Sequence, residues 1–380
     1  MRLKLSKAIK KITRMVFVFG LVICSLGTLY MQLPMFGKLP WGEYQARIER
    51  SPNYKNGRFF NQNETPLMSG NPIKSMLKFL LHSGRFFSSD RRSPKNKLPV
   101  IKTDLKNLDS EEDWLVWFGH SSYLIRIKGK NILVDPLFSE VSSPVCFFPR
   151  AFSGTEAYQA EDMPEIDYLI ITHDHWDHLD YETMLKLRPK IKKVICGLGV
   201  GAHLEYWGFD REQIIEMDWQ ENISLGVDFS IYCLPARHFS GRGILRNRSL
   251  WASFLLKTND FSIYIGGDSG YGAHYSDIGN KFGPIDLVIL NSGQHDKNWK
   301  YIHMAADEVL KASRDMRAKM LLPVHLCKIV LANHGWKEPL VELSQLISGE
   351  NFLLLTPIIG EKINLRRKKQ IFSRWWENCE

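Results

Sequence analysis

The chain has 380 residues, of which 44% are hydrophobic and 24% are charged, and this balance excludes a largely disordered polypeptide because a sizeable core can form. The net charge of +9 is uneven: the first 100 residues carry 18 Lys and Arg against 4 Asp and Glu, and the remaining 280 carry 32 against 37. A basic arm on a slightly acidic body indicates an acidic partner, either nucleic acid or an anionic membrane.

The N-terminal segment favours the membrane. Residues 15–31, MVFVFGLVICSLGTLYM, form an uncharged run of 17 residues that follows six Lys and Arg. As a helix this run would span roughly 25 Å, the short end of what crosses a bilayer. The basic cluster predicts a cytoplasmic N-terminus and a single-pass anchor with the remaining chain outside the cytoplasm. The alternative is a cleaved signal peptide and a secreted or periplasmic protein, for which Ser25-Leu26-Gly27 supplies small residues.

The composition changes along the chain. We expect residues 1–31 to form the basic cluster and anchor helix, residues 32–110 a basic, partly irregular connector, residues 111–366 the folded domain and residues 367–380 a C-terminal tail. The connector is rich in Asn, Pro and Gly, which favour turns. Within it, the spacing of apolar residues in IKSMLKFLLHSGRFF, residues 73–87, predicts an amphipathic helix.

From Trp114 onward, short apolar or alternating runs predict strands. These runs are WLVWF, SYLIRI, NILVDP, IDYLIIT, KKVIC, FSIYCLPA, WASFLLKT, FSIYIGGD, IDLVILNSG and AKMLLPVH. Helical patterns intervene after His178, around residues 199–207 and at residues 304–316. Strands in two batches with helices between them predict an α/β fold of two stacked sheets with helices outside.

The stretch IITHDHWDHLD, residues 170–180, places three His and three Asp directly behind a predicted strand. In extended backbone, residues i and i+2 face the same way, so His173 and His175 can face one ion. Asp177 and His178 then fall at the turn into a helix and can reach a second ion. Imidazole nitrogen and carboxylate oxygen suit zinc. Trp176 is interpreted as a packing residue.

Four ligands in six residues cannot complete two metal sites, so this hypothesis requires distant partners at strand ends. His238 follows FSIYCLP, Asp268 ends FSIYIGGD and His325 ends KMLLPVH. Any one of these residues alone is more simply explained as solvated or hydrogen-bonded. Their joint occurrence in this order indicates a metal centre.

These residues and their order resemble the metallo-β-lactamase superfamily, whose H-x-H-x-D-H motif is followed by a later His, Asp and His. From Trp114 to Leu340 the chain is most similar to the branch that contains the phospholipase D acting on N-acylphosphatidylethanolamine and the ascorbate-6-phosphate lactonase. The stretches that carry this similarity include WFGHSSYLIRIKGKNILVDPLFS, LGVGAHLEYWGF, PARHFSGRG and GDSGYG. Residues 292–300 and 326–329 depart from the branch pattern.

The resemblance implies an αββα sandwich with two Zn²⁺ ions at one edge. The expected ligands are His173, His175 and His238 for one zinc, Asp177, His178 and His325 for the other, and Asp268 as a bridge. A carboxylate at the bridging position, where zinc β-lactamases commonly have Cys, argues against antibiotic hydrolysis. Two zinc ions about 3.5–4 Å apart can share a water whose pKa falls to ~7, and the resulting bound hydroxide can attack a phosphodiester.

We also expect roles for other polar residues near the predicted ligands. Asp177 and Asp268 are expected to act catalytically through the metals, and His303 is a candidate proton donor, with a structural role at a helix start as its alternative. We expect His120 and Asp135 to be hydrogen-bond partners of ligands or turn residues, and His203 and Cys327 to be structural. Asp174 and Asp180 are interpreted as bystanders, and Arg242, Arg246 and Arg248 as a solvated charge run.

The combined prediction is a membrane-associated zinc phosphodiesterase of phospholipase D type that acts on N-acylphosphatidylethanolamine-like phospholipids. The expected partners are this phospholipid or another small phosphodiester and the membrane; no nucleic acid is expected, and the oligomeric state, a dimer included, is left open. A lactonase or other C–O or C–N hydrolase is the enzymatic alternative, and a non-catalytic metal-binding module is the second. A nuclease ranks lower because the basic residues precede the catalytic domain and adjoin the apolar run.

Overall fold

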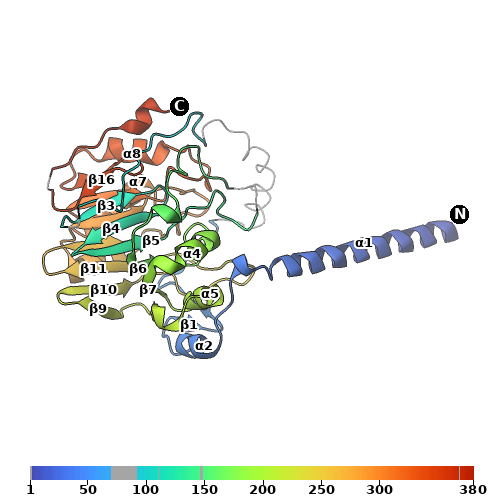
Figure 1. The fold of residues 1–380 in the computed structure, drawn as a ribbon. Coiled ribbons are helices and arrows are strands. Elements are labelled where there is room, and N and C mark those ends of the chain that lie inside the picture. The colour runs from blue at the N-terminus through green and yellow to red at the C-terminus, as the bar shows by residue number, and fades with distance from the viewer. Residues whose placement is uncertain (1, 70–91, 110, 146–148, 368) are drawn as a thin grey trace.

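A computed structural model describes residues 2–69, 92–109, 111–145, 149–367 and 369–380 (Figure 1). The amphipathic helix expected within residues 73–87 lies outside the described residues. The expected helices are confirmed as α4 (Tyr181–Leu187), α5 (Gly201–Tyr206) and α7 (Ala306–Asp315).

Two seven-stranded mixed sheets form the body. The first has the order β16-β3-β4-β5-β6-β7-β8 and the second the order β15-β14-β13-β12-β11-β10-β9. The first sheet comprises β3 (Trp114–Trp117), β4 (Tyr123–Ile127), β5 (Lys130–Val134), β6 (Ile166–Ile171), β7 (Ile191–Gly197), β8 (Ile214–Met217) and β16 (Lys362–Asn364). The second comprises β9 (Asn222–Gly226), β10 (Phe229–Leu234), β11 (Ser253–Thr258), β12 (Ser262–Ile265), β13 (Leu287–Asn291), β14 (Met320–Val324) and β15 (Leu353–Leu354).

Alternation along the strands separates three apolar layers. Leu115 and Trp117 of β3 belong to the central cluster between the sheets, where Ile231 of the second sheet also lies. Val116, which faces the opposite way, joins a cluster with Met184 and with residues of α5. The second sheet is covered on its outer face by α6 (His274–Phe282), α7 and α8 (Glu338–Leu346). The predicted αββα sandwich is therefore confirmed.

Short 3-10 helices link several elements. They are η1 (Pro34–Phe36), η2 (Ala160–Asp162), η3 (Arg188–Lys190), η4 (Arg211–Gln213) and η5 (Trp375–Asn378).

The N-terminal helix α1 (Arg2–Tyr30) extends away from the sheets (Figure 1). Its segment Lys10–Tyr30 has 21 residues, a mean hydropathy of 2.0 and no buried residue. A helix of this length and composition can cross a membrane or serve as a signal sequence. Within the part of the helix whose side chains are described, Lys10–Tyr30, none belongs to the core clusters of the sandwich.

The segment between α1 and the body packs against the sandwich. It contains α2 (Gly42–Ile48) and the hairpin β1 (Tyr54–Lys55) and β2 (Arg58–Phe59). Ile48 and Phe59 are fully buried in the central apolar cluster. We call residues 58–69, which continue from this hairpin across the body, the strap.

Candidate metal centre

The seven predicted ligands come together at one edge of the sandwich. In the first sheet, His173 to His178 follow β6, which runs parallel to β5 and β7. In the second sheet, Asp268 follows β12 and His325 follows β14, and these strands are both parallel to β13. The carboxyl ends of parallel strands meet at one edge of a sheet, so the topology brings distant residues together.

Asp268 lies at the centre of the cluster. Its Oδ2 atom is 3.3 Å from His178 Nε2, 3.3 Å from His325 Nε2 and 3.7 Å from His238 Nε2. The distance from the same oxygen to His173 Nε2 is 3.9 Å. A single carboxylate oxygen therefore faces both predicted groups of ligands.

The first group contains His173, His175 and His238. His175 Nδ1 is 2.8 Å from His173 Nε2 and 3.2 Å from His238 Nε2. These three ring nitrogens converge on one point beside Asp268. The group therefore provides three nitrogen donors for one cation.

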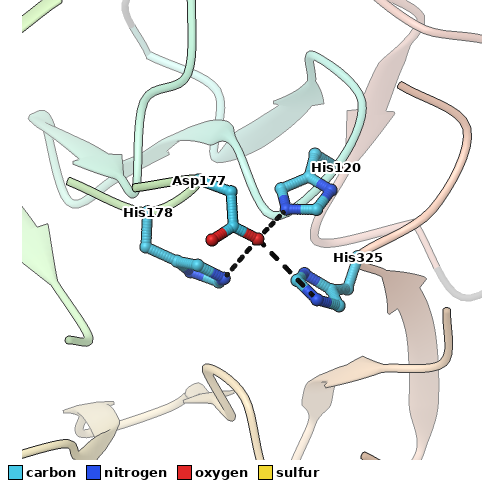
Figure 2. A group of neighbouring side chains, drawn as sticks. All are labelled: His120, Asp177, His178 and His325. Carbon is cyan, nitrogen blue, oxygen red and sulfur yellow. Dashed lines mark hydrogen bonds and ion pairs between the residues drawn. The ribbon is translucent and has the colours of Figure 1, made fainter. Parts of the chain in front are cut away.

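The second group is drawn in Figure 2 and contains Asp177, His178 and His325, with His120 beside them. Asp177 Oδ2 lies 3.6 Å from His178 Nε2 and 4.0 Å from His325 Nε2. His120 Nε2 lies 2.9 Å from the same oxygen. The expectation that His120 is a hydrogen-bond partner at the site is confirmed.

Polar groups of the fold contact the Nδ1 atoms of several imidazoles, on the side of each ring that faces away from the centre. Asp135 Oδ2 lies 2.8 Å from His178 Nδ1 and accepts a hydrogen bond from Thr172 Oγ1, as expected for a supporting carboxylate. The backbone oxygen of Ile302 lies 3.1 Å from His238 Nδ1. Ser121 Oγ lies 3.0 Å from His325 Nδ1. These contacts fix the ring orientations and leave the Nε2 atoms toward the centre.

The electrostatics of the site suit cation binding. Burial lowers the pKa of His173, His238 and His325 well below the ordinary value, so their rings carry a free lone pair at neutral pH. Burial alone would raise the pKa of Asp268, but the surrounding imidazoles hold it well below its usual range. Burial alone would lower the pKa of His178 as well, but the carboxylates of Asp268, Asp177 and Asp135 raise it well above its ordinary value. The site therefore combines neutral imidazoles with ionised carboxylates and one imidazole whose proton a bound cation would displace.

Several buried polar atoms at the centre have no hydrogen-bond partner among the described residues. They include His178 Nε2, His325 Nε2 and Asp268 Oδ1. An unpaired polar atom costs about 1–3 kcal/mol when it is buried. Such unpaired atoms in one cluster of ligand-type side chains fit a bound metal, because the metal would supply the missing partner.

A cleft of about 350 Å³ opens above the cluster. Its walls include Phe239, Trp299 and Ile302, and His303 and Arg246 add polar groups. Burial lowers the pKa of His303 to about 4, and its Nδ1 lies 3.9 Å from Asp268 Oδ2. The mostly apolar cleft with polar groups at its base is typical of a ligand site.

The strap takes part in the site, and no pattern in its sequence indicates this. Leu67 and Met68 line the cleft, although they belong to the expected connector. Asn61 donates from Nδ2 to the His238 backbone oxygen at 2.7 Å and accepts from the His238 amide at 3.1 Å. A turn-rich composition carries no signal for such contacts, because they depend on residues far away in the chain.

The interpretation of Arg242 as part of a solvated charge run was wrong, whereas Asp174 and Asp180 lie outside the candidate metal groups, as expected, but are buried and hydrogen-bonded. Asp174 is buried and accepts hydrogen bonds from Ser249 Oγ and the Gly241 amide, both at 2.6 Å. Arg242 is also buried, and its guanidinium lies 4.1 Å from the ring of Trp176. The burial of Asp174 and Arg242 could not be predicted from the sequence, because a charged side chain is buried only where the fold brings hydrogen-bond partners to it. Asp180 is likewise buried and bonded, through Ser139 and Thr183.

The expectations that His203 and Cys327 are structural agree with the structure. His203 is buried in α5, and its Nδ1 accepts a hydrogen bond from the Lys38 amide at 3.0 Å. Cys327 is a buried free thiol, as expected. Arg246 is exposed and Arg248 is partly buried.

Comparison with known proteins agrees with the geometry. The family model described as a β-lactamase superfamily domain matches residues 130–326, slightly more than half of the chain. The chain is 32% identical to an uncharacterized protein of Mycobacterium tuberculosis over 336 residues, which cover 87% of this chain and 89% of the relative. It is also 27% identical over 294 residues to the N-acyl-phosphatidylethanolamine-hydrolyzing phospholipase D 1 of Caenorhabditis elegans, covering 71% of this chain and 81% of that protein.

Solved structures share the architecture. An isothiocyanate hydrolase from Delia radicum gut bacteria aligns with a TM-score of 0.53 at 19% identity and covers 66% of this chain and 98% of its own. This likeness supports the fold alone. The chain belongs to the β-lactamase superfamily, and it is a metallo-β-lactamase-fold hydrolase with a His/Asp cluster that can bind metal.

Proposed function

We propose that this chain is a membrane-anchored dizinc phosphodiesterase of phospholipase D type, acting on N-acylphosphatidylethanolamine-like phospholipids. The observation that carries the proposal is the cluster around Asp268, in which imidazole nitrogens and carboxylate oxygens converge. The substrate class is supported by the worm relative and by the mitochondrial N-acyl-phosphatidylethanolamine-hydrolyzing phospholipase D of Saccharomyces cerevisiae. The yeast protein is 32% identical over 246 residues, which cover 62% of this chain and 52% of that protein.

The donor set fits zinc because imidazole nitrogen and carboxylate oxygen are its common ligands in catalytic sites. In the proposal His173, His175 and His238 hold one ion, Asp177, His178 and His325 hold the other, and Asp268 Oδ2 faces both. Bound zinc would activate a water for attack and stabilise negative charge on the phosphate oxygens.

Other residues of the chain would orient the ligands and exclude water from the cleft. Asp135 orients the His178 ring, and His120 donates to Asp177 and holds that carboxylate in place. Phe239, Trp299 and Leu331 form apolar walls that limit water around the phosphodiester. Since the lowered pKa leaves His303 neutral at pH 7, its N–H would stabilise the leaving oxygen through a hydrogen bond.

The membrane part of the proposal rests on α1. Six Lys and Arg precede the uncharged run of residues 15–31, and this bias supports a cytoplasmic N-terminus with the sandwich on the other side of the membrane. Such an anchor holds the cleft near the lipids that it would hydrolyse.

The proposal is tested with full-length protein in mixed phospholipid vesicles, comparing the parent with Asp268→Asn. Zinc content per chain, products from each phospholipid and the circular dichroism spectrum are measured together. We expect the parent to hold about two zinc ions and to release phosphatidic acid together with the free headgroup alcohol. The variant should lose this activity while its circular dichroism spectrum stays unchanged. Asp260→Asn, in the exposed turn at the opposite end of β12, is the matched control.

A second assay separates the reaction classes. Hydrolysis of bis(p-nitrophenyl) phosphate is compared with a panel of small lactones, using the same preparations. Turnover of lactones alone would end the phosphodiesterase proposal. Protein that retains no zinc and turns over neither substrate would identify a non-catalytic module instead.

A further inference from the structure

The loop of residues 241–246, GRGILR, lies between His238 and β11 and presents apolar side chains to solvent. Ile244 is 76% exposed and Leu245 is 51% exposed. Single exposed apolar residues are ordinary on a protein surface, but adjacent ones beside a ligand cleft indicate an interaction site. We call residues 243–246 the rim loop.

The rim loop faces the end of α1. A cavity of about 640 Å³ is lined by Met31 and Gln32, directly after α1, and by Ile244 and Leu245. The hydroxyl of Tyr30, the last residue of α1, donates to the backbone oxygen of Pro144. The residues at the end of the apolar helix therefore line the same cavity as the rim loop.

A second hollow connects this place with the metal centre. Its volume is about 490 Å³, and Met31 and Ile244 line it together with His175 and Asp177. Arg246 borders both this hollow and the cleft above the cluster. A path with apolar and cationic walls thus leads from the end of α1 to the proposed ligands.

Buried contacts fix the rim loop to the segment after α1. Arg242 donates from Nη2 to the Met35 backbone oxygen at 2.8 Å and from Nη1 to the Leu179 backbone oxygen at 2.6 Å. Trp207 Nε1 donates to the Pro34 backbone oxygen at 2.7 Å. Since Arg242 precedes the rim loop and binds the segment after α1, these two surfaces keep a fixed relation to each other.

We infer that the rim loop and the end of α1 together form a lipid-docking face, through which a phospholipid passes from the bilayer into the cleft without entering water. The occupant is a bilayer surface because α1 would bring its own interface to Tyr30, where an aromatic residue marks a membrane boundary. Exposed Lys38 and Arg246 flank the apolar side chains and complement anionic headgroups. The inference deepens the proposed function and rests on its membrane anchor.

The test attaches an environment-sensitive nitrobenzoxadiazole probe to Ile244→Cys in the full chain, with Cys24, Cys146 and Cys379 replaced by Ser. Cys196, Cys233 and Cys327 are buried and stay as they are. The protein is reconstituted in vesicles of phosphatidylcholine and phosphatidylglycerol, with and without nitroxide-labelled lipid. The matched control is Val227→Cys, because Val227 is 93% exposed and precedes β10, which has its other end toward His238.

We expect a blue shift and strong nitroxide quenching of the probe at position 244 and neither effect at position 227. Equal quenching at both positions would overturn the inference. A blue shift at position 244 that rises with protein concentration and lacks quenching by labelled lipid would also overturn it, because a second copy would then be the occupant. Because the readout is fluorescence, loss of phospholipid hydrolysis does not affect it, and failure of the anchor appears separately as loss of vesicle binding.

A functional readout complements the probe. Ile244→Ser combined with Leu245→Ser should raise the KM for phospholipid in vesicles several-fold and leave turnover of bis(p-nitrophenyl) phosphate unchanged. Val227→Ser should change neither. An unchanged KM for vesicle phospholipid in the double variant would contradict passage through the rim.

Discussion

At the scale of single residues, the metal centre depends on groups that hold the ligands as well as on the ligands. Asp135 contacts His178 and also accepts hydrogen bonds from the amide and hydroxyl of Thr172 at 2.9 and 2.6 Å. It therefore links β6 to the ring that faces Asp268. Loss of its charge changes both the orientation and the basicity of that ring.

We expect Asp135→Asn to weaken zinc binding by about 10- to 100-fold. The amide can keep only part of the contacts, because one carboxylate oxygen becomes a donor and opposes the His178 N–H. Competition with a chelator of known zinc affinity measures the change. Asp286→Asn, which alters a carboxylate that accepts from the Ser262 amide away from the centre, should leave zinc affinity unchanged.

Asn61 offers a second test at this scale. Removing its side chain leaves the His238 backbone without two partners, and Trp251 Nε1 also loses a contact. Asn61→Ala should reduce the free energy of unfolding by about 1–3 kcal/mol. Urea unfolding of the metal-free protein measures it. Asn63→Ala, at an exposed position of the strap, should have little effect, and an equal loss in both variants would contradict the assignment.

The seven clustered residues could be predicted from the sequence because each follows an apolar run and the order is specific. Asn61, Asp174 and Arg242 could not. Their importance comes from contacts across the fold, such as the bond between Arg242 and Met35, and no local pattern predicts which distant carbonyl an arginine will reach.

At the scale of elements, strand length and burial together decided which strands were predictable. The apolar runs of β6, β13 and β14 are buried along their whole length or nearly so, and they stand out in the sequence. The three-residue β16 pairs with β3 at the edge of its sheet, and β9 alternates between partly buried and exposed residues. Such short or half-exposed strands can be recognised only when the strands with which they pair are known.

A buried acid of β8 contacts the turn between β7 and α5. Glu216 of β8 accepts hydrogen bonds from the amides of Gly199 and Gly201 at 2.8 and 2.9 Å. Burial raises its pKa to about 7 despite these bonds. Between its unfolded pKa of about 4.5 and this value, the native state keeps a proton that the unfolded chain releases, so stability falls as the pH rises.

Glu216→Gln should remove this dependence. Relative to the variant, the parent should lose about 3 kcal/mol of unfolding free energy as the pH rises from about 4.5 to 7. Denaturant titrations of the metal-free proteins at several pH values measure the difference. A parent and variant whose stabilities stay parallel across this window would show that Glu216 titrates normally.

At the scale of the whole molecule, the N-terminal region has two physical characters. The segment Lys10–Tyr30 contributes no buried residue, whereas Ile48 and Phe59 are completely buried in the central core. The sequence shows the first character plainly through hydropathy and charge. It does not show the second, because a segment rich in turn residues carries no periodic pattern.

Truncation separates these characters. Protein 32–380 should unfold at the same temperature as the full chain in detergent but should no longer sediment with vesicles. Protein 70–380 should be strongly destabilised, because loss of a large buried side chain such as Phe59 costs about 3–5 kcal/mol by itself. Differential scanning calorimetry and vesicle sedimentation measure the two effects. Equal melting temperatures for 70–380 and 32–380 would contradict the packing of the strap.

The contact between the strap and the His238 loop also determines when the protein can finish folding. Asn61 leaves the ribosome 177 residues before its partner His238, and Ser121 leaves it 204 residues before His325. At roughly 5–20 residues per second, the chain waits many seconds for these pairings. During translation the early half therefore exposes an incomplete ligand set beside an already emerged apolar helix, and full-affinity metal loading must follow synthesis of His325.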